Sequence, residues 1–406
     1  MANKGFDLDK FISEYVTRRK RSMFWPDIVR HKEKLSGKIE GKTTLVIGGA
    51  GSIGSSFIQA LLPFAPKTLV VVDVNENALT ELTRNLRSMK EMFVPDDYIT
   101  YPMDYAAPVF KKMFIERGGF DIVANFSAHK HVRSEKDIYS IEALMQNNVL
   151  HAKGLLELLS EYPPEEYFCV STDKAANPVN IMGASKRVME DVVFSYSDKF
   201  PVKTARFANV AFSNGSLPAG FLERIARHQP ISAPLDVKRY FVSPQESGQI
   251  CLLACMLGEN REIFIPKLEE AQMITFDAVA VSLLKEHGYD VLLCDSDDEA
   301  LRKAADLTNG DMKYPVYFSV SDTSGEKAYE EFYTDSETVD MIRFESLGVI
   351  VGKKMPERKK LDCLLEELSG AFDSSVATKR DIIEILSRYL PDFEHLEKGK
   401  SLDRKM

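Results

Sequence analysis

Two patterns of hydrophobic residues alternate along most of the chain. Short apolar runs typical of buried strands are separated by longer amphipathic segments typical of helices. The expected strands lie at 43–47, 68–72, 98–101, 121–125 and 167–170. Helices are expected from about Ser55 and over 77–89. This alternation predicts an α/β fold built on a Rossmann-type, doubly wound parallel sheet.

Beyond about residue 212 the alternation is less regular, and proline and glycine are more frequent. Apolar runs at 263–265, 291–293 and 316–319 predict strands of a smaller, interleaved C-terminal substrate domain. A final pair of helices is expected at 361–368 and 379–390.

These changes of pattern divide the chain into four predicted parts. They are an N-terminal helical appendage (1–40), a Rossmann domain (41–260), a substrate-binding domain (261–350) and a C-terminal helical tail (351–406). Residues 211–242 are expected to contribute to the substrate site.

The appendage combines an apolar helical face with a basic run. Phe11, Ile12, Tyr15 and Val16 fall on one face of a helix, and basic residues occupy 18–21. We interpret the run as a solvated helix end or an oligomer arm, with contact to a membrane surface or a polyphosphate as the alternative.

Composition narrows the class of protein. The 406 residues are 44% hydrophobic and 28% charged, which is ordinary for a soluble globular protein. A formal net charge of -9 argues against general nucleic-acid binding. Neither a membrane-length apolar run nor a signal-peptide pattern is present, and the five cysteines lack metal-type spacing. We therefore expect a cytoplasmic protein with reduced thiols and no membrane span.

A glycine turn directly follows the first expected strand and opens a helix. The run Gly48-Gly-Ala-Gly-Ser-Ile-Gly54 fits the spacing of dinucleotide-binding turns, in which the backbone approaches a pyrophosphate at a helix N-terminus. Asp73 ends the next strand, where an acid binds the adenosine ribose and repels a 2′-phosphate. The pattern predicts NAD as cofactor, held by Gly48, Gly51, Ser52, Ile53, Gly54, Asp73 and Asp104.

The segment from Ser171 to Arg187 carries the candidate reacting groups. Thr172, Asp173 and Lys174 stand shortly before Lys186, and Met182 lies four residues before that lysine. A short-chain dehydrogenase/reductase has Tyr-x-x-x-Lys here, with tyrosine transferring the proton. A thioether has no proton to give, so either the site is inactive or its chemistry lies with Asp173 and Lys174.

Seven segments, in order, resemble nucleotide-sugar 4,6-dehydratases of the polysaccharide-biosynthesis (CapD-like) family, within the extended short-chain dehydrogenase/reductases. The similarity covers roughly 42–340. The segments are 48–54, 126–132 (Phe-Ser-Ala-His-Lys-His-Val), 147–149 (Asn-Asn-Val), 171–187, 206–210 (Arg-Phe-Ala-Asn-Val), 238–241 (Lys-Arg-Tyr-Phe) and 324–331. Two positions depart from the family pattern: Ile47 replaces a threonine and Ser324 a proline.

The resemblance implies a reaction in which NAD is a recycled catalyst. The C4 alcohol is oxidised, water leaves across C5–C6, and hydride returns to C6. By similarity Asp173 is the acid for the C6 hydroxyl, Lys174 is the C5 base, and Thr172 binds the C4 oxygen. Asp173 must hold a proton and Lys174 must lose one, so we expect burial to outweigh their mutual attraction.

The resemblance also implies binding roles. Lys186 binds the nicotinamide ribose, and Asn148 supports it through the strand-end backbone or a water. Asn209 contacts sugar or phosphate, and Arg239 clamps the diphosphate. Lys130 and Glu326 complete the expected substrate site. No metal is expected, because His129 and His131 have no evident third ligand.

Met182 leaves the identity of the C4–OH base open. Some family members carry methionine where others carry tyrosine, so an active enzyme is expected. The candidates are ionised Asp173, which we favour, and a water held by Thr172 and Lys186.

The sequence thus predicts NAD-dependent 4,6-dehydration of a UDP-N-acetylhexosamine, with UDP-GlcNAc as the implied substrate. The alternatives are a nucleotide-sugar epimerase or oxidoreductase on the same scaffold, and a catalytically silent nucleotide-binding protein. Lys174 favours the dehydratase, because an epimerase needs no C5 base beside the acid. A homo-oligomer is expected from the resemblance alone.

Overall fold

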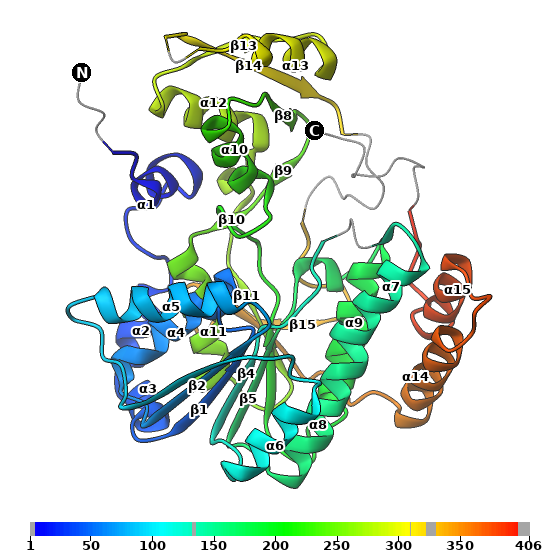
Figure 1. Cartoon of the computed structure of the whole chain (residues 1–406). Coiled ribbons are helices and arrows are strands. Elements are labelled where there is room, and N and C mark those ends of the chain that lie inside the picture. The colour runs from blue at the N-terminus through cyan, green and yellow to red at the C-terminus, as the bar shows by residue number, and fades with distance from the viewer. Residues whose placement is uncertain (1–4, 132–134, 309, 322–329, 397–406) are drawn as a thin grey trace.

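A nine-stranded sheet with helices on both faces forms the larger part of the computed structural model (Figure 1), which describes residues 5–131, 135–308, 310–321 and 330–396. The strand order is β15-β16-β11-β6-β5-β4-β1-β2-β3. The strands are β1 (Thr43–Ile47), β2 (Thr68–Asp73), β3 (Asp97–Pro102), β4 (Ile122–Asn125), β5 (Glu166–Val170), β6 (Val202–Ala205), β11 (Glu262–Pro266), β15 (Thr338–Asp340) and β16 (Leu347–Val351). The predicted α/β class and Rossmann-type parallel sheet are confirmed.

The order of strands reverses at β1, which creates the binding crevice. β1 pairs in parallel with both β2 and β4, and Ile47 lies opposite Val72 on one side and Asn125 on the other. In open α/β sheets, ligands bind outside the carboxyl ends of the strands at such a switch point. The fold therefore directs attention to the loops after β1, β4 and β5.

Helices cover both faces of this sheet (Figure 1). One face carries α4 (Ser52–Leu61), α5 (Glu76–Ser88) and α11 (Pro244–Leu257), and the other carries α6 (Pro108–Glu116), α8 (His151–Glu161) and α9 (Ile181–Phe194). α4 and α11 touch at backbone distance, because a Cβ on Gly248 would lie 2.1 Å from the Ser56 carbonyl oxygen. Only glycine allows this approach.

A smaller unit stands over the carboxyl ends of the strands. Its sheet has the order β13-β14-β8, and its residues form a second hydrophobic core. Its elements are β8 (Ile231–Pro234), β13 (Asp290–Leu293), β14 (Lys313–Ser319), α10 (Leu217–Ala226), α12 (Phe276–Glu286) and α13 (Asp297–Ala305). The strands expected at 291–293 and 316–319 are confirmed here.

The strand expected at 263–265 belongs to the large sheet and not to the substrate-binding domain in which the sequence-based division places it. It is β11, and it pairs in parallel with β6 and antiparallel with β16 in the large sheet. All five residues of β11 are buried, as expected of a central strand covered on both faces. Strands from both sides of the predicted boundary at residue 260 therefore share the large sheet. The small sheet also crosses this boundary, because β8 precedes residue 260 whereas β13 and β14 follow it.

The N-terminal segment packs against both units. The first helical turns, α1 (Leu8–Phe11) and η1 (Ile12–Val16), bury Phe11, Ile12 and Val16 in the small core. α2 (Trp25–Arg30) and α3 (Lys32–Ile39) pack on the large core. Within the basic run, the Arg19 guanidinium binds the Glu246 carboxylate at 2.8 and 2.6 Å, so this residue is an ion-pair partner and not a solvated charge.

The remaining elements include the expected C-terminal pair, α14 (Arg358–Phe372) and α15 (Lys379–Tyr389), beside α9 (Figure 1). The others are η2 (Leu62–Phe64), α7 (Ile138–Met145), η4 (Gln146–Leu150), η5 (Asp173–Ala175), η6 (Glu270–Gln272), β7 (Asn209–Val210), β9 (Lys238–Arg239), β10 (Phe241–Val242) and β12 (Ile274–Thr275). Within the described ranges, no helix has both the length and the apolar character needed to cross a membrane.

Candidate active site

A cavity of about 460 Å³ opens between the large sheet and the small unit. It brings together residues that are far apart in the sequence. The predicted residues that line it are Gly48, Gly51, Ser52, Ile53, Gly54, Lys130, Thr172, Asp173, Lys174, Met182, Lys186 and Asn209. Apolar side chains, including Phe126, Phe207, Phe241 and Phe276, form much of the remaining wall.

The glycine turn has the geometry required to receive a phosphate group. Gly48 has φ +69°, and a Cβ there would lie 2.7 Å from the Ser127 backbone nitrogen. A Cβ on Gly54 would lie 2.4 Å from the Gly48 carbonyl oxygen. Gly51 caps α4 without a side-chain hydrogen bond, so the first N–H groups of the helix remain available to an anion. The turn therefore fits a dinucleotide diphosphate.

Asp73 and Asp104 lie at the carboxyl ends of β2 and β3, outside the cavity wall. The Asp73 carboxylate ends β2 and accepts hydrogen bonds from the backbone N–H groups of Ala50 (3.1 Å) and Asn75 (3.0 Å). Asp104 is exposed and accepts a local hydrogen bond from the Ala106 N–H at 2.8 Å. Asp73 is thus fixed against the turn, and both cofactor roles stay predictions.

Lys186 is buried on α9, at the end of β5. Its Nζ donates to the Val170 carbonyl oxygen at 3.1 Å. Burial lowers its pKa to about 8, against opposing effects of Cys169 and Glu190. The predicted supporter Asn148 lies outside the cavity wall; it donates to Ser185 Oγ (3.0 Å) and binds both backbone groups of His129.

Thr172, Asp173 and Lys174 form a hydrogen-bonded group where β5 passes into η5. Thr172 Oγ1 donates to Asp173 Oδ1 at 2.6 Å. Lys174 Nζ lies 3.2 and 3.1 Å from the two Asp173 carboxylate oxygens. Two donors on one carboxyl group suit its ionised form, which makes Asp173 an available proton acceptor.

The pKa of Lys174 is shifted in the direction opposite to the one expected from the sequence. Burial lowers the pKa of its amine, but the carboxylates of Asp173 and Glu330 outweigh burial and raise that pKa above its ordinary value. The expectation that burial outweighs the attraction between Lys174 and its carboxylate neighbours is therefore wrong. In this arrangement the group is an ammonium ion, and it must lose a carboxylate neighbour's influence before it can act as a base.

Met182 lies in the first turn of α9 with its side chain against the cavity. It is 2% exposed, and its backbone N–H donates to Glu135 Oε1 at 2.9 Å. The next residue, Gly183, packs against the backbone of Lys174, because a Cβ on Gly183 would lie 2.6 Å from the Lys174 carbonyl oxygen. Met182 thus forms an apolar wall and has no proton-transfer role.

Two of the four residues predicted to bind the substrate line the cavity. Lys130 and Asn209 line the cavity, and the Asn209 amide donates to Glu330 Oε1. Arg239 is buried outside the wall, with Nε 3.7 Å from Glu330 Oε1, so the expected diphosphate clamp stays a prediction. Glu326 lies outside the described residues.

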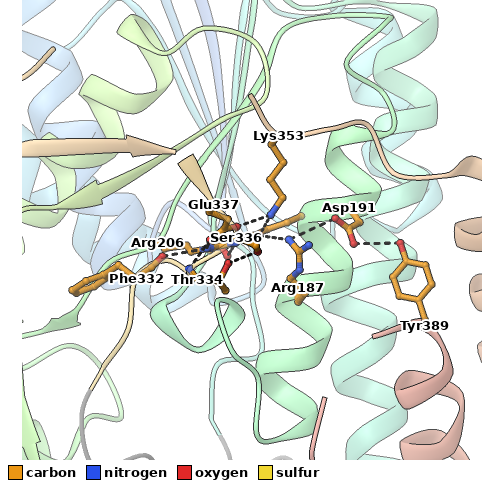
Figure 2. A network of polar contacts seen from close by, with 11 residues as sticks. Arg187, Asp191, Arg206, Phe332, Thr334, Ser336, Glu337, Lys353 and Tyr389 are labelled. Carbon is orange, nitrogen blue, oxygen red and sulfur yellow. Dashed lines mark hydrogen bonds and ion pairs between the residues drawn. The ribbon is translucent and has the colours of Figure 1, made fainter. Parts of the chain in front are cut away.

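Two features of the site are not predicted from the sequence. Glu330 lies in the family segment 324–331, and its carboxylate contacts Asn209, Arg239 and the Tyr240 N–H. The second is a buried ion network that contains Arg206, Glu190, Glu337 and Lys353 (Figure 2). Arg206 belongs to the family segment 206–210, but no local pattern links it to Glu190, Glu337 or Lys353.

The pattern of the polysaccharide biosynthesis protein family matches residues 44–351. The chain belongs to this family. An uncharacterised membrane protein of Methanocaldococcus jannaschii is 30% identical over 87% of the chain and 98% of its own length. The UDP-N-acetylglucosamine 4,6-dehydratase (inverting) of Campylobacter jejuni is 23% identical, over 75% and 86% of the two chains. The capsular polysaccharide biosynthesis protein CapD of Staphylococcus aureus is 26% identical over 74% of the chain, which spans about half of CapD.

Solved structures of low sequence identity share the fold of this chain. Pen from Bacillus thuringiensis has a TM-score of 0.61 at 20% identity and covers 82% of this chain and 98% of its own. DesIV, a dTDP-glucose 4,6-dehydratase from Streptomyces venezuelae with NAD and TYD bound, has a TM-score of 0.53 at 18% identity, covering 71% and 88%. A UDP-N-acetylglucosamine 4-epimerase from Methanobrevibacter ruminantium has a TM-score of 0.53 at 15% identity, covering 73% and 91%. Named nucleotide-sugar dehydratases and epimerases are thus among the relatives and structural neighbours.

Proposed function

We propose that this chain catalyses the NAD-dependent 4,6-dehydration of a UDP-N-acetylhexosamine, with UDP-GlcNAc as the first substrate to test. The observation that carries the proposal is the bonded Asp173–Lys174 pair on the wall that also holds the glycine turn and Lys186. An acid and a base side by side are what removal of water from neighbouring carbons requires. The 4-keto-6-deoxy product would serve polysaccharide or glycan synthesis.

The chain's own residues would supply the proton transfers. Lys174 would take the proton from C5, and Asp173 would donate one to the departing C6 hydroxyl. Thr172 would place its hydroxyl at the C4 oxygen, next to Asp173. Asn209 and Lys130 line the part of the cavity left for the sugar nucleotide.

The cofactor assignment rests on the fit of the glycine turn. NAD would supply the hydride acceptor and donor for C4 and C6. Its diphosphate would lie on Gly48–Gly54, its adenosine ribose at Asp73, and its nicotinamide ribose at Lys186. The open helix N-terminus, the Asp73 carboxylate bound to the Ala50 N–H and the buried Lys186 amine support these placements.

Asp173 is also our candidate for the C4–OH base. Met182 carries no proton, and the Asp173 carboxylate already accepts the Thr172 hydroxyl hydrogen bond. A carboxylate that takes the C4 proton holds the proton that the C6 hydroxyl later needs. One residue could therefore serve both steps without a tyrosine.

Incubation with UDP-GlcNAc and NAD tests the proposal by mass spectrometry and NMR of the product. We expect loss of one water and a 4-keto-6-deoxy sugar. A product of unchanged mass would instead establish an epimerase. No turnover of UDP-, dTDP- or GDP-sugars, with NAD bound, would establish a silent binding protein.

Gly54→Ala should weaken NAD binding. The added Cβ would lie 2.4 Å from the Gly48 carbonyl oxygen and 2.7 Å from the Gly49 Cα, so the turn must move. Overpacking costs roughly 1–3 kcal/mol, equivalent to roughly 5–150-fold in affinity. Calorimetric titration with NAD measures the change. Gly154→Ala is the matched control, because nothing lies within 4 Å of a Cβ there; equal affinity of the two variants would contradict the assigned turn.

A further inference from the structure

An N-terminal arm, residues 11–19, contacts two segments beside the cavity although it lies outside the residues that match the family pattern. The two segments are β10 and the turn that leads into residues 213–216, and both contribute to the cavity wall. β10 pairs with β7 and places Phe241 opposite Asn209, a predicted substrate-binding residue. The arm therefore contacts the substrate side of the site through the segments that form its wall.

Arg19 joins β10 to the first turn of α11. Its Nη2 donates to the Phe241 carbonyl oxygen at 3.0 Å, and the guanidinium binds the Glu246 carboxylate at 2.8 and 2.6 Å. The Arg19 side chain is 13% exposed and that of Glu246 is 1% exposed, so solvent screens this pair little. Glu246 also accepts the backbone N–H groups of Ser243 (2.8 Å) and Met23 (3.1 Å). The planar guanidinium thus ties the Phe241 backbone to a carboxylate that is itself fixed.

The second contact of the arm supports a strained turn. Phe212 has φ +54°, a left-handed conformation that bulky residues rarely adopt, so neighbouring structure must stabilise it. The Phe11 ring packs edge-on against the Phe212 ring, with centroids 5.8 Å apart and planes at 82°. Two residues further on, the Asn214 N–H donates to Ser52 Oγ at 2.9 Å, at the start of α4. The arm therefore supports the cavity wall at two separate places.

We propose that Arg19 is a positioning residue that fixes Phe241 and the adjoining wall for a bound nucleotide sugar. Its part in turnover rests on the proposed function, because a nucleotide sugar is the ligand that this wall would meet. Its effect on the wall itself requires no ligand. Loss of the guanidinium would remove a donor from the Phe241 carbonyl oxygen and the cation from Glu246, so β10 would lose this link to α11.

Hydrogen–deuterium exchange of the full chain, read at single amides by fragmentation mass spectrometry, tests the proposal. The amides to follow are those of Asn209 and Ala211, which donate across the β7–β10 pair to carbonyl oxygens on either side of Phe241. We expect Arg19→Met to speed their exchange by roughly tenfold, the effect of one lost charge-assisted hydrogen bond on local opening. The amides of β1 and β2 should exchange as in the wild type.

Arg21→Met is the matched control. Arg21 lies in the same basic run, and its guanidinium stacks 4.5 Å from the centroid of the Trp25 ring, so exchange should coincide with that of the wild type. Arg19→Met exchange equal to that of the wild type overturns the proposal. Faster exchange that extends equally to β1 and β2 also overturns it, because it would show a general loss of stability.

Arg19→Lys gives the decision should Arg19→Met not fold. Lysine keeps a cation opposite Glu246 but lacks the planar fork that also serves the Phe241 carbonyl oxygen. The Asn209 and Ala211 amides should therefore still exchange faster than in the wild type. Wild-type exchange in a folded Arg19→Lys protein contradicts the proposal.

Turnover separates positioning of the substrate from positioning of the reacting groups. Arg19→Met should raise KM for the nucleotide sugar by roughly tenfold and leave kcat and NAD affinity little changed. A lower kcat at unchanged KM would contradict a role on the substrate side. Failure of the wild type to release water from any nucleotide sugar would refute the proposed function and leave the exchange result intact.

Discussion

Lys174→Ala should lower the rate of water loss from UDP-GlcNAc by roughly 10²–10⁴-fold, the range for removal of a general base. The amine is the only candidate C5 base that the cavity wall presents within hydrogen-bond distance of Asp173 among the described residues. NAD affinity should change little, because the glycine turn and Lys186 are untouched. Initial rates of product formation, with NAD binding measured in parallel, give the result.

Lys174→Arg separates the charge of the residue from its ability to accept a proton. It retains a positive charge beside Asp173, yet a guanidinium does not deprotonate in proteins and cannot serve as a base. We expect it to be about as slow as Lys174→Ala. A Lys174→Arg enzyme with near wild-type rate would show that the residue acts by charge alone and that another group removes the C5 proton.

Arg206→Met should be the most destabilising single change outside the cavity. The guanidinium is fully buried and binds Glu190 at 2.8 and 2.7 Å and Glu337 at 2.8 and 3.0 Å. Removing one partner of a buried ion pair leaves uncompensated charge and costs about 3–5 kcal/mol. Urea unfolding followed by circular dichroism measures the loss. Arg187→Met is the control; this side chain is 25% exposed and lies 3.2 Å from Glu190 and 3.7 Å from Asp191. A smaller loss is expected, because Glu190 keeps Arg206 and Lys353 as partners.

The network also predicts acid sensitivity. Burial raises the pKa of Glu337, but Arg206 and Lys353 outweigh it and lower that pKa from 4.5 to about 2. A carboxyl group with a depressed folded-state pKa stabilises the protein above pH 4.5, and this contribution is lost as pH falls toward 2. The wild type should therefore lose stability over that interval, and Arg206→Met should lose less. Identical slopes for the two proteins would contradict the role of Arg206.

Local patterns predict most of the large sheet because each central strand is apolar on both faces. Thr43–Ile47 and Thr68–Asp73 carry this signal in a few consecutive residues. The same signal predicts a strand at Glu262–Pro266 but not the sheet to which it belongs, because a fully buried strand has the same apolar pattern in any sheet. β11 pairs with β6 after the chain has passed through β8, and β16 joins β11 only after the chain has formed β13 and β14; no local pattern encodes these two returns to the large sheet.

For the candidate site, the sequence predicts which side chains meet but not how their charges balance. Gly48, Asp173 and Lys186 share one cavity as expected, because strand ends and helix starts converge at the switch point. Glu330 arrives from a segment after the small unit, and it changes the pKa of Lys174 in the direction opposite to burial. Which charged groups come together in the site depends on the tertiary structure and not on any local sequence pattern.

In the proposed reaction, hydride leaves C4 and returns to C6 while water is lost. Reaction with UDP-GlcNAc deuterated at C4, followed by mass spectrometry and NMR of the product, traces this transfer. We expect a product lighter by one water, with a 4-keto group and the deuterium on C6. An isomer of unchanged composition that keeps its deuterium on C4 would refute 4,6-dehydration.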